Sequence, residues 1–301
     1  MTHHKNFFFF LLFVAMIGWG GSWVNAKVLG AYASPFELVF VRYLITSVSM
    51  IPVLLYFKKS FKIDLRTFGI VIIAAILMIS YSKFFFLGTT LGTASLGGAF
   101  VTTLIPINTF IIFVLFFNRP MSKKDGFALG LGALGVMTIL GVWHLSREQI
   151  MTVYNLYFIL ASLIWPLLTI VSSKSTKVSP MVFSFYMYVA TMFLDLLLID
   201  VRTLQTAHWD STFWAHMIFL SLGATTFSTS VYFIGVEKLG SKEVSSFVFL
   251  VPFAAIGLSA LFLGERISGW MIIGTIMTII AVALLNNIIK IKRKKIETSQ
   301  Y

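Results

Sequence analysis

Apolar runs long enough to cross a lipid bilayer follow one another along almost the whole of this 301-residue chain. The chain is 58% hydrophobic and only 11% charged, and short polar gaps separate the runs. A helix needs roughly 20 apolar residues to span a bilayer, and ordinary soluble domains do not reach this composition. The ten-residue alternating pattern typical of an outer-membrane barrel is absent from the sequence. The sequence therefore predicts an all-α, multi-pass membrane protein without a sizeable soluble domain.

The two halves of the sequence share one layout. Residues 239–269 contain a polar entry, an apolar run with Pro252 in its middle, and a tight charged turn before the next run. Residues 91–122 repeat this layout around Pro106, 146 positions earlier. Further pairs keep an offset of 145, namely Ser34-Pro35 with Ser179-Pro180, Tyr43 with Tyr188, and Thr67-Phe68 with Thr212-Phe213. A fixed offset of this kind indicates an internal duplication.

We predict ten transmembrane helices, arranged as two five-helix repeats over residues 1–146 and 147–290, and a basic tail over 291–301. The first span is expected at residues 7–24 and the tenth at 270–289. Because each repeat has an odd number of spans, the second repeat enters the membrane from the opposite face. Inverted repeats of this kind are used by alternating-access transporters. A cleavable signal peptide is the alternative for the first run, but its removal would leave the first repeat one helix short.

The lysines and arginines are strongly biased to one side of this predicted topology. Most loop cations fall on the side of the two termini, whereas only Lys27, Arg147, Arg202 and Arg266 fall on the other. Cytoplasmic loops carry the excess of basic residues in membrane proteins. We therefore expect both termini in the cytoplasm and the chain in the cytoplasmic (inner) membrane.

Two cations and one acid lie inside predicted spans, namely Arg42 in the second, Lys83 in the third and Asp195 in the seventh. An ionised side chain inside a bilayer costs roughly 2.5–3.5 kcal/mol on insertion scales, so such residues usually face a wet cavity or a partner. All three are expected in the outer half of the membrane, around a polar cavity that suits a substrate with a carboxylate or phosphate. Alternatively, Arg42 or Lys83 extends to the interface, or pairs with Glu37 or Asp195 to hold helices together.

Aromatic and amide side chains complete the candidate site. Trp19 and Trp165 occupy matching places well inside the first span of each repeat, where lining a central site and ordinary packing are equal alternatives. Tyr232 shares a stripe with Ser221, Thr225 and Ser228, and small hydroxyl residues at helical spacing more often pack helices together than bind ligands. The predicted substrate-binding set is Lys83, Arg42, Trp19, Trp165, Tyr188, Asp195, Asn108 and Tyr232.

The turn Leu263-Gly264-Glu265-Arg266 precedes the tenth span. An acid near a helix N-terminus is favoured by the helix dipole, so Glu265 is expected to act in turn and helix-start chemistry rather than in catalysis. Pro106 and Pro252 are expected to bend their spans and free backbone carbonyls.

These features together resemble the EamA-type family of the drug/metabolite transporter superfamily. The resemblance rests on the two-repeat plan, the segment Gly18-Trp19-Gly20-Gly21-Ser22-Trp23 with Lys27 after it, the two proline-bearing spans and the Gly264-Glu265-Arg266 turn. The first repeat has Asn118-Arg119-Pro120 at the equivalent turn, without an acid. The resemblance implies a ten-helix carrier that moves small metabolites, often amino acids, nucleotides or amphipathic compounds, across the cytoplasmic membrane, usually outward.

The sequence disfavours other classes of function. An intramembrane enzyme would need paired acids, a metal-binding set or a serine with a base, but the five histidines are predicted at chain ends and in loops, and the chain has no cysteine. No phosphate-binding Gly-Lys-Ser/Thr loop is encoded, and we expect no cofactor, no metal and no nucleic-acid partner. The expected partners are a small-molecule substrate and the lipid bilayer, with a homodimer left open. A channel-like or lipid-translocating protein of the same fold is the alternative function.

Overall fold

The computed structural model describes residues 2–143, 152–199, 206–240, 244, 246–286 and 288, with side chains from residue 6 onward. The helices are α1 (Thr2–Leu29), α2 (Pro35–Tyr56), α3 (Leu65–Leu91), α4 (Ala94–Phe116), α5 (Lys123–Ile139), α7 (Val153–Ser172), α8 (Pro180–Leu196), the short 3₁₀-helix η1 (Thr206–His208), α9 (Ser211–Ile218), the π-helix η2 (Phe219–Phe227), α10 (Ser228–Leu239), α12 (Leu250–Leu263) and α13 (Gly269–Leu285).

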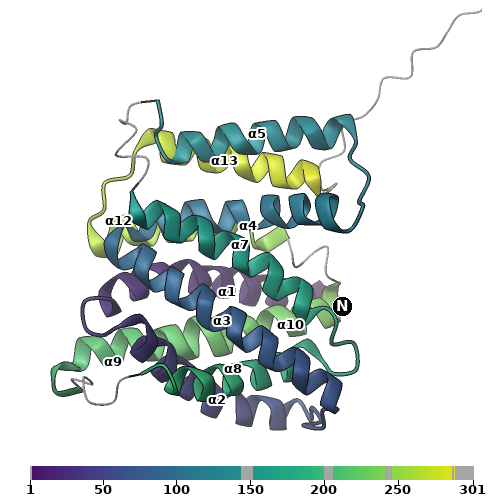
Figure 1. Cartoon of the computed structure of the whole chain (residues 1–301), viewed down its shortest axis with the longest axis vertical. Helices are drawn as coiled ribbons and strands as arrows, with labels where there is room; N and C mark the ends of the chain where they lie inside the picture. The colour runs from purple at the N-terminus through teal and green to yellow at the C-terminus, as the bar shows by residue number, and fades with distance from the viewer. Residues whose placement is uncertain are drawn as a thin grey trace, which may run out of the picture.

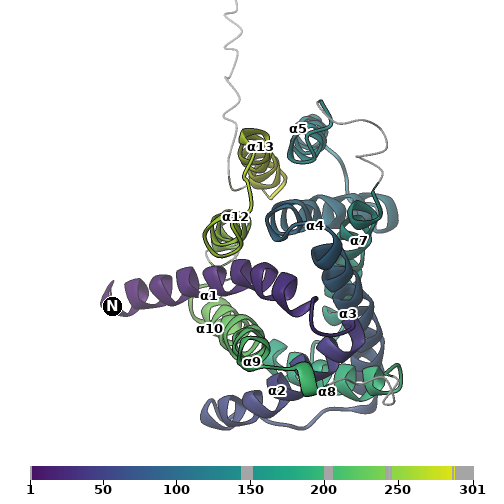
Figure 2. The ribbon, with the colours of Figure 1, turned by 90° about the vertical axis from the view of Figure 1, so that its left-hand side faces the viewer.

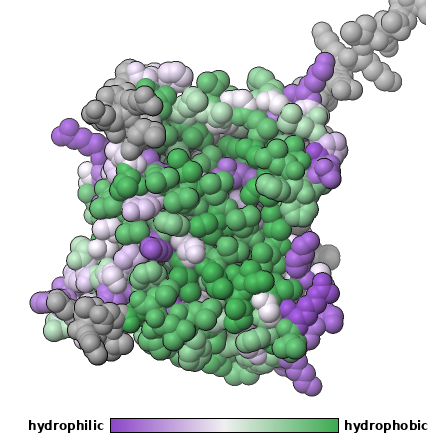
Figure 3. Space-filling model, viewed as in Figure 1, coloured by the Kyte–Doolittle hydropathy of each residue, from purple (hydrophilic) through white to green (hydrophobic). Residues whose placement is uncertain are grey.

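These helices form the predicted ten membrane segments, because α9, η2 and α10 join into one helix over Ser211–Leu239. In the described residues, six segments are long and apolar enough to cross a membrane, and α8, α12 and α13 are shorter apolar helices. Most segments run across the molecule from one lateral edge of the view to the other (Figure 1). Hydrophobic side chains cover the middle of the face in Figure 3, whereas hydrophilic ones gather at its two lateral edges, where helices end. Such an apolar belt matches the surface of a protein surrounded by lipid.

The two repeats pack as intertwined halves. In Figure 2, where α5, α13 and α12 are seen nearly end-on, α13, α12 and α10 lie on the left, α5, α4, α7 and α3 lie on the right, and α2 and α8 close the lower end. The helix α1 crosses between the two sides. Three corresponding pairs meet directly, namely α2 with α8, α4 with α12, and α5 with α13. Further contacts between the repeats are reciprocal, because α3 of the first repeat packs on α7 of the second just as α1 packs on η2 and α10. Reciprocal contacts of this kind are expected when two similar units are related by a common axis.

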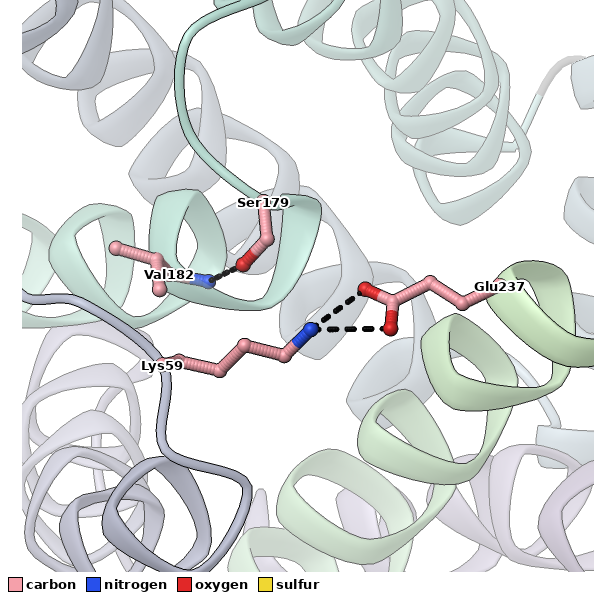
Figure 4. A network of polar contacts seen from close by, with 4 residues as sticks. All are labelled: Lys59, Ser179, Val182 and Glu237. Atoms are coloured by element: carbon pink, nitrogen blue, oxygen red, sulfur yellow. Dashed lines mark hydrogen bonds and ion pairs between the residues drawn. The ribbon is translucent and has the colours of Figure 1, made fainter.

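Matched capping residues start the corresponding helices of the two repeats. The Ser34 hydroxyl accepts from the Glu37 N–H at 3.4 Å, and the Ser179 hydroxyl accepts from the Val182 N–H at 3.3 Å, in each case with proline at the start of the helix (the second bond is drawn in Figure 4). Asp64 and Asp210 cap α3 and α9 in the same manner, each at 3.0 Å. Capping satisfies N–H groups that have no partner within the helix, so the repeated sequence signals fix the same boundaries twice.

On one face of the molecule, polar links join the end of α2 to the end of α10, and the loop after α7 to the start of α3. Lys59 Nζ lies 2.9 and 3.0 Å from the two carboxylate oxygens of Glu237 (Figure 4), and Lys177 Nζ lies 3.0 Å from Asp64. Hydrogen bonds from Thr67 and Lys177 hold the pKa of the Asp64 carboxyl well below its usual range, so this residue is charged at neutral pH.

The opposite face gathers the other helix ends. Tyr32, after α1, donates to Asp210, before α9, at 3.3 Å, and the turn after α12 contacts the start of α4. The connection after α2 therefore lies on one face and the connection after α8 on the other. Because α2 and α8 are corresponding helices, the two repeats cross the membrane in opposite senses.

The proline-bearing helices differ between the repeats. Pro106 lies inside the uninterrupted α4, whereas Pro252 lies in the first turn of α12, just after a turn at Val248 and Phe249. Proline is tolerated in a first turn because the N–H that it lacks would have no helical partner there. The ninth span is therefore interrupted as expected, and the break lies just before Pro252.

Because the two repeats cross the membrane in opposite senses, two single-cysteine variants should be labelled from opposite sides of the membrane. The chain has no cysteine of its own, so Lys58→Cys and Leu198→Cys each give one reporter at the end of a corresponding helix. In intact cells, a membrane-impermeant maleimide should react with Leu198→Cys, and with Lys58→Cys only after permeabilisation. Equal labelling of both positions in intact cells would contradict the opposite orientation of the two repeats.

Candidate functional site

The seam between the repeats, where α2 of the first repeat packs on α8 and η2 of the second, contains two stacked tyrosines. Tyr43 in α2 and Tyr188 in α8 are both buried, and their ring centroids lie 5.1 Å apart at an interplanar angle of 17°. They occupy equivalent positions of the two repeats at the offset of 145, so the axis relating the repeats passes between them. The Tyr43 hydroxyl also lies 3.2 Å from the Ser82 hydroxyl of α3.

Arg42, next to this stack, reaches from the first repeat into the second. Its Nε and Nη2 lie 3.2 and 3.0 Å from the Thr225 hydroxyl oxygen, which accepts both hydrogen bonds. The guanidinium carbon lies 5.3 Å from the centre of the Tyr43 ring and 6.0 Å from that of Phe85. These contacts place a half-buried cation among aromatic rings at the seam.

The described contacts give Arg42 no negatively charged partner. The ion pairs among the described residues are Lys59 with Glu237 and Lys177 with Asp64, both at helix ends. Glu37, the acid nearest along α2, forms a capping box with Ser34 instead. A guanidinium has five N–H donors, and the bonds to Thr225 use two of them. Arg42 therefore keeps donors and positive charge for an anionic group.

The partner of Arg42 lies in an unusual helical segment. Residues Phe219–Phe227 form the π-helix η2, within which the Thr225 hydroxyl donates to the Leu220 carbonyl at 2.8 Å. Across the seam, the Ser49 and Thr226 hydroxyls are 2.6 Å apart. π-Helical turns within α-helices frequently occur at functional sites. The stripe of hydroxyl residues predicted in the eighth span thus includes Thr225, the hydrogen-bond acceptor of Arg42, as well as residues that pack helices together.

Two tryptophan–tyrosine pairs flank the seam, and in each pair one ring comes from the first repeat and the other from the second. Trp19 of α1 lies 5.2 Å from Tyr232 of α10, and Trp165 of α7 lies 4.6 Å from Tyr81 of α3, measured between ring centroids. Tyr81 also stacks on Phe85, which lies beside Arg42. The structure therefore connects Trp165 and Tyr188 to Arg42 through contacting rings, whereas Trp19 and Tyr232 form a separate pair.

The remaining predicted residues lie away from the guanidinium group. Lys83 Nζ lies 5.2 Å from the centre of the Phe36 ring in the first turn of α2. Asn108 donates to the carbonyl and the hydroxyl of Ser162 at 3.1 and 3.0 Å, which ties α4 to α7. Asn108 also borders a largely apolar groove of about 390 Å³ between α4 and α5. Asp195 is completely buried near the end of α8.

His216 departs from its predicted place in a loop. It lies within α9, and its Nδ1 is 2.7 Å from the side-chain oxygen of the buried Asn25 in α1. The prediction missed this contact because His216 is only a few residues from the loop before α9. Among the described residues, no group of three or more histidine, aspartate or glutamate side chains is placed to hold a metal ion.

Glu265 links the two repeats on the outer face of the predicted topology. Its two carboxylate oxygens accept from the backbone N–H groups of Ala94 and Ser95, each at 2.8 Å. Glu265 therefore caps α4 of the first repeat, whereas we predicted from the sequence that it acts at the start of the tenth span, which is α13. Lys27 donates to the carbonyls of Thr90 and Gly92 at 2.8 and 2.7 Å, at the end of α3. Both charges complement the ends of the helices that they contact.

Removing this cap should destabilise the fold. Glu265→Ala should lower the free energy of unfolding by about 1–2 kcal/mol, because it leaves two N–H groups at the helix start without their charged acceptor. The measurement is the melting temperature of purified protein in detergent, with Arg266→Ala as the control because Arg266 is the exposed neighbour. Equal melting temperatures for both variants would contradict the cap.

The helix arrangement and the seam define an inverted-repeat, multi-pass membrane protein. The EamA-like transporter family matches the chain twice, over residues 6–141 and 152–287. The chain therefore belongs to this family of the drug/metabolite transporter superfamily, and is a small-molecule membrane transporter.

Known proteins with similar sequences or folds cover nearly the whole chain. The uncharacterized transporter YvbV of Bacillus subtilis (strain 168) is 24% identical over 285 residues, which are 92% of this chain and 90% of YvbV. The uncharacterized transporter YyaM of the same organism is 20% identical over 297 residues, which are 96% of each chain. A solved crystal structure shares the fold with a TM-score of 0.63 at 17% identity, over 93% of this chain and 96% of that one.

Proposed function

We propose that this chain is a secondary transporter of the cytoplasmic membrane that exports small metabolites carrying a carboxylate or phosphate, by alternating access. Amino-acid-like compounds are the first candidates, because they combine a carboxylate with a small body. Both termini would lie in the cytoplasm, as the bias of basic loop residues predicts. The moving units would be the two repeats, residues 1–146 and 147–290.

The observation that carries this proposal is the half-buried Arg42 without a carboxylate partner among the described residues. A cation inside a membrane protein is costly and usually marks a substrate or ion pathway. Arg42 sits where the repeats meet, and its hydrogen bonds cross from α2 to η2. A substrate anion could replace Thr225 as the acceptor and contact both repeats. Tyr43 and Phe85 would then present aromatic surface to the rest of the substrate.

Arg42→Gln should reduce transport about 10- to 100-fold, because a hydrogen bond to a charged group contributes roughly 1.5–3 kcal/mol. The substrate is first identified by comparing metabolites that accumulate outside cells with and without the chain. Its transport is then measured in proteoliposomes. Arg66→Gln is the matched control, because it removes an equal charge from an exposed position in the first turn of α3.

The same assay separates the carrier from the alternative function. Saturable and stereoselective uptake that depends on Arg42 supports the proposal. Flux that does not saturate, or scrambling of lipid between leaflets, would instead identify a channel-like or lipid-translocating protein. Equal losses in Arg42→Gln and Arg66→Gln would contradict the role of Arg42.

A further inference from the structure

Asp195 is a buried acid that the binding of an anionic substrate does not require. Its side chain is completely buried, and neither carboxylate oxygen has a side-chain hydrogen-bond partner among the described residues. The backbone N–H of Phe40 in α2 is the polar group that approaches the carboxyl group. The Thr191 hydroxyl, one helical turn earlier on the same face of α8, is also buried without a partner. Burying an unpaired carboxylate costs several kcal/mol or more, whereas the neutral acid costs far less.

The charged and titratable groups on the helices that pack against α8 are engaged elsewhere. On α2, Glu37 caps its own helix with Ser34 and Arg42 bonds Thr225. The hydroxyl of Tyr43, the remaining titratable group near the middle of α2, lies beside Ser82.

The same holds for α3 and α10. On α3, Lys83 lies over Phe36, Tyr81 contacts Trp165, and Arg66 is exposed in the first turn. On α10, Tyr232 contacts Trp19, Glu237 pairs with Lys59, and Lys238 lies over Phe8. No described cation is therefore paired with the Asp195 carboxylate.

Asp195 is also placed where movement at the seam would reach it. It follows Tyr188 by two helical turns on one face of α8, and Tyr188 stacks on Tyr43 of α2. The same pair of helices, α2 and α8, thus carries Arg42, the tyrosine stack and the buried acid. A shift of α8 against α2 that admits a substrate at Arg42 would also admit water to Asp195.

We propose that Asp195 is a proton-binding site that couples proton movement to transport. In the conformation described here, the carboxyl group holds a proton. When the seam between α2 and α8 opens, the O–H bond breaks, the proton passes to water, and the electron pair stays on the carboxylate. Reprotonation accompanies closure. The coupling rests on the proposed transport function, whereas the proton-binding site itself does not.

Infrared spectroscopy tests the proton site without a substrate. Purified protein in lipid at neutral pH should show the carbonyl stretch of a protonated carboxyl group, and Asp195→Asn, which keeps the side-chain shape, should lose that band. Asp64→Asn is the control, because Asp64 is a surface acid paired with Lys177, and it should keep the band. A band that survives in Asp195→Asn, or that responds to sodium rather than to pH, would overturn the proposal.

Transport in proteoliposomes tests the coupling, with a mixture of amino acids as the probe and the membrane potential clamped at zero. With one proton per solute, a pH difference of about one unit should shift the steady-state solute distribution about tenfold in the wild type. Asp195→Asn should still equilibrate the solute but lose this shift. An equal shift in both proteins would overturn the coupling. If neither protein transports any solute, the transport proposal fails for this substrate class, and the infrared band still decides whether Asp195 holds a proton.

Discussion

The lack of water in the bilayer core is the constraint on which this structure depends. Every backbone N–H and carbonyl must find a partner within the protein, which explains a chain of helices with side-chain caps at their exposed starts. The same constraint makes each buried polar side chain expensive. Buried charged side chains are therefore few among the described residues, and several of the buried or half-buried polar groups meet where the two repeats face each other. Arg42 with Thr225, and Ser49 with Thr226, join α2 of one repeat to the π-helix of the other.

The two repeats are similar in sequence pattern, yet their roles at the seam differ. The first repeat supplies Arg42, and the second supplies the π-helix that holds it and the buried Asp195. On one face, Lys59 and Glu237 join the repeats by an ion pair, and on the other, Glu265 of the second repeat caps a helix of the first. An inverted duplication can keep its overall symmetry while single residues specialise, because symmetry of the backbone does not require symmetry of the side chains. Under the proposed function, this division would give the transporter one substrate site instead of two.

The sequence predicted what depends on local signals. Apolar runs, helix-start residues such as Ser34 and Ser179, and the constant offset between the halves predicted the ten helices and their two-repeat order. The offset also matched Tyr43 with Tyr188, whose contact the structure adds. The sequence did not predict contacts that depend on how helices pack. Thr225 became the partner of Arg42 through the π-helix, for which the sequence gives no clear signal. Glu265 reached across to α4 because the outer ends of the two repeats lie side by side.

Alternating access requires the two repeats to move against each other at this seam during transport. Lys59 and Glu237 join the ends of α2 and α10 on one face, and a chain without cysteine allows each to be replaced by cysteine in the same variant. Transport is measured in proteoliposomes before and after the pair is linked by a short, reducible bis-thiosulfonate. We expect transport to stop when the two cysteines are linked and to return when the link is reduced. Transport that continues at full rate with the link intact would contradict the account.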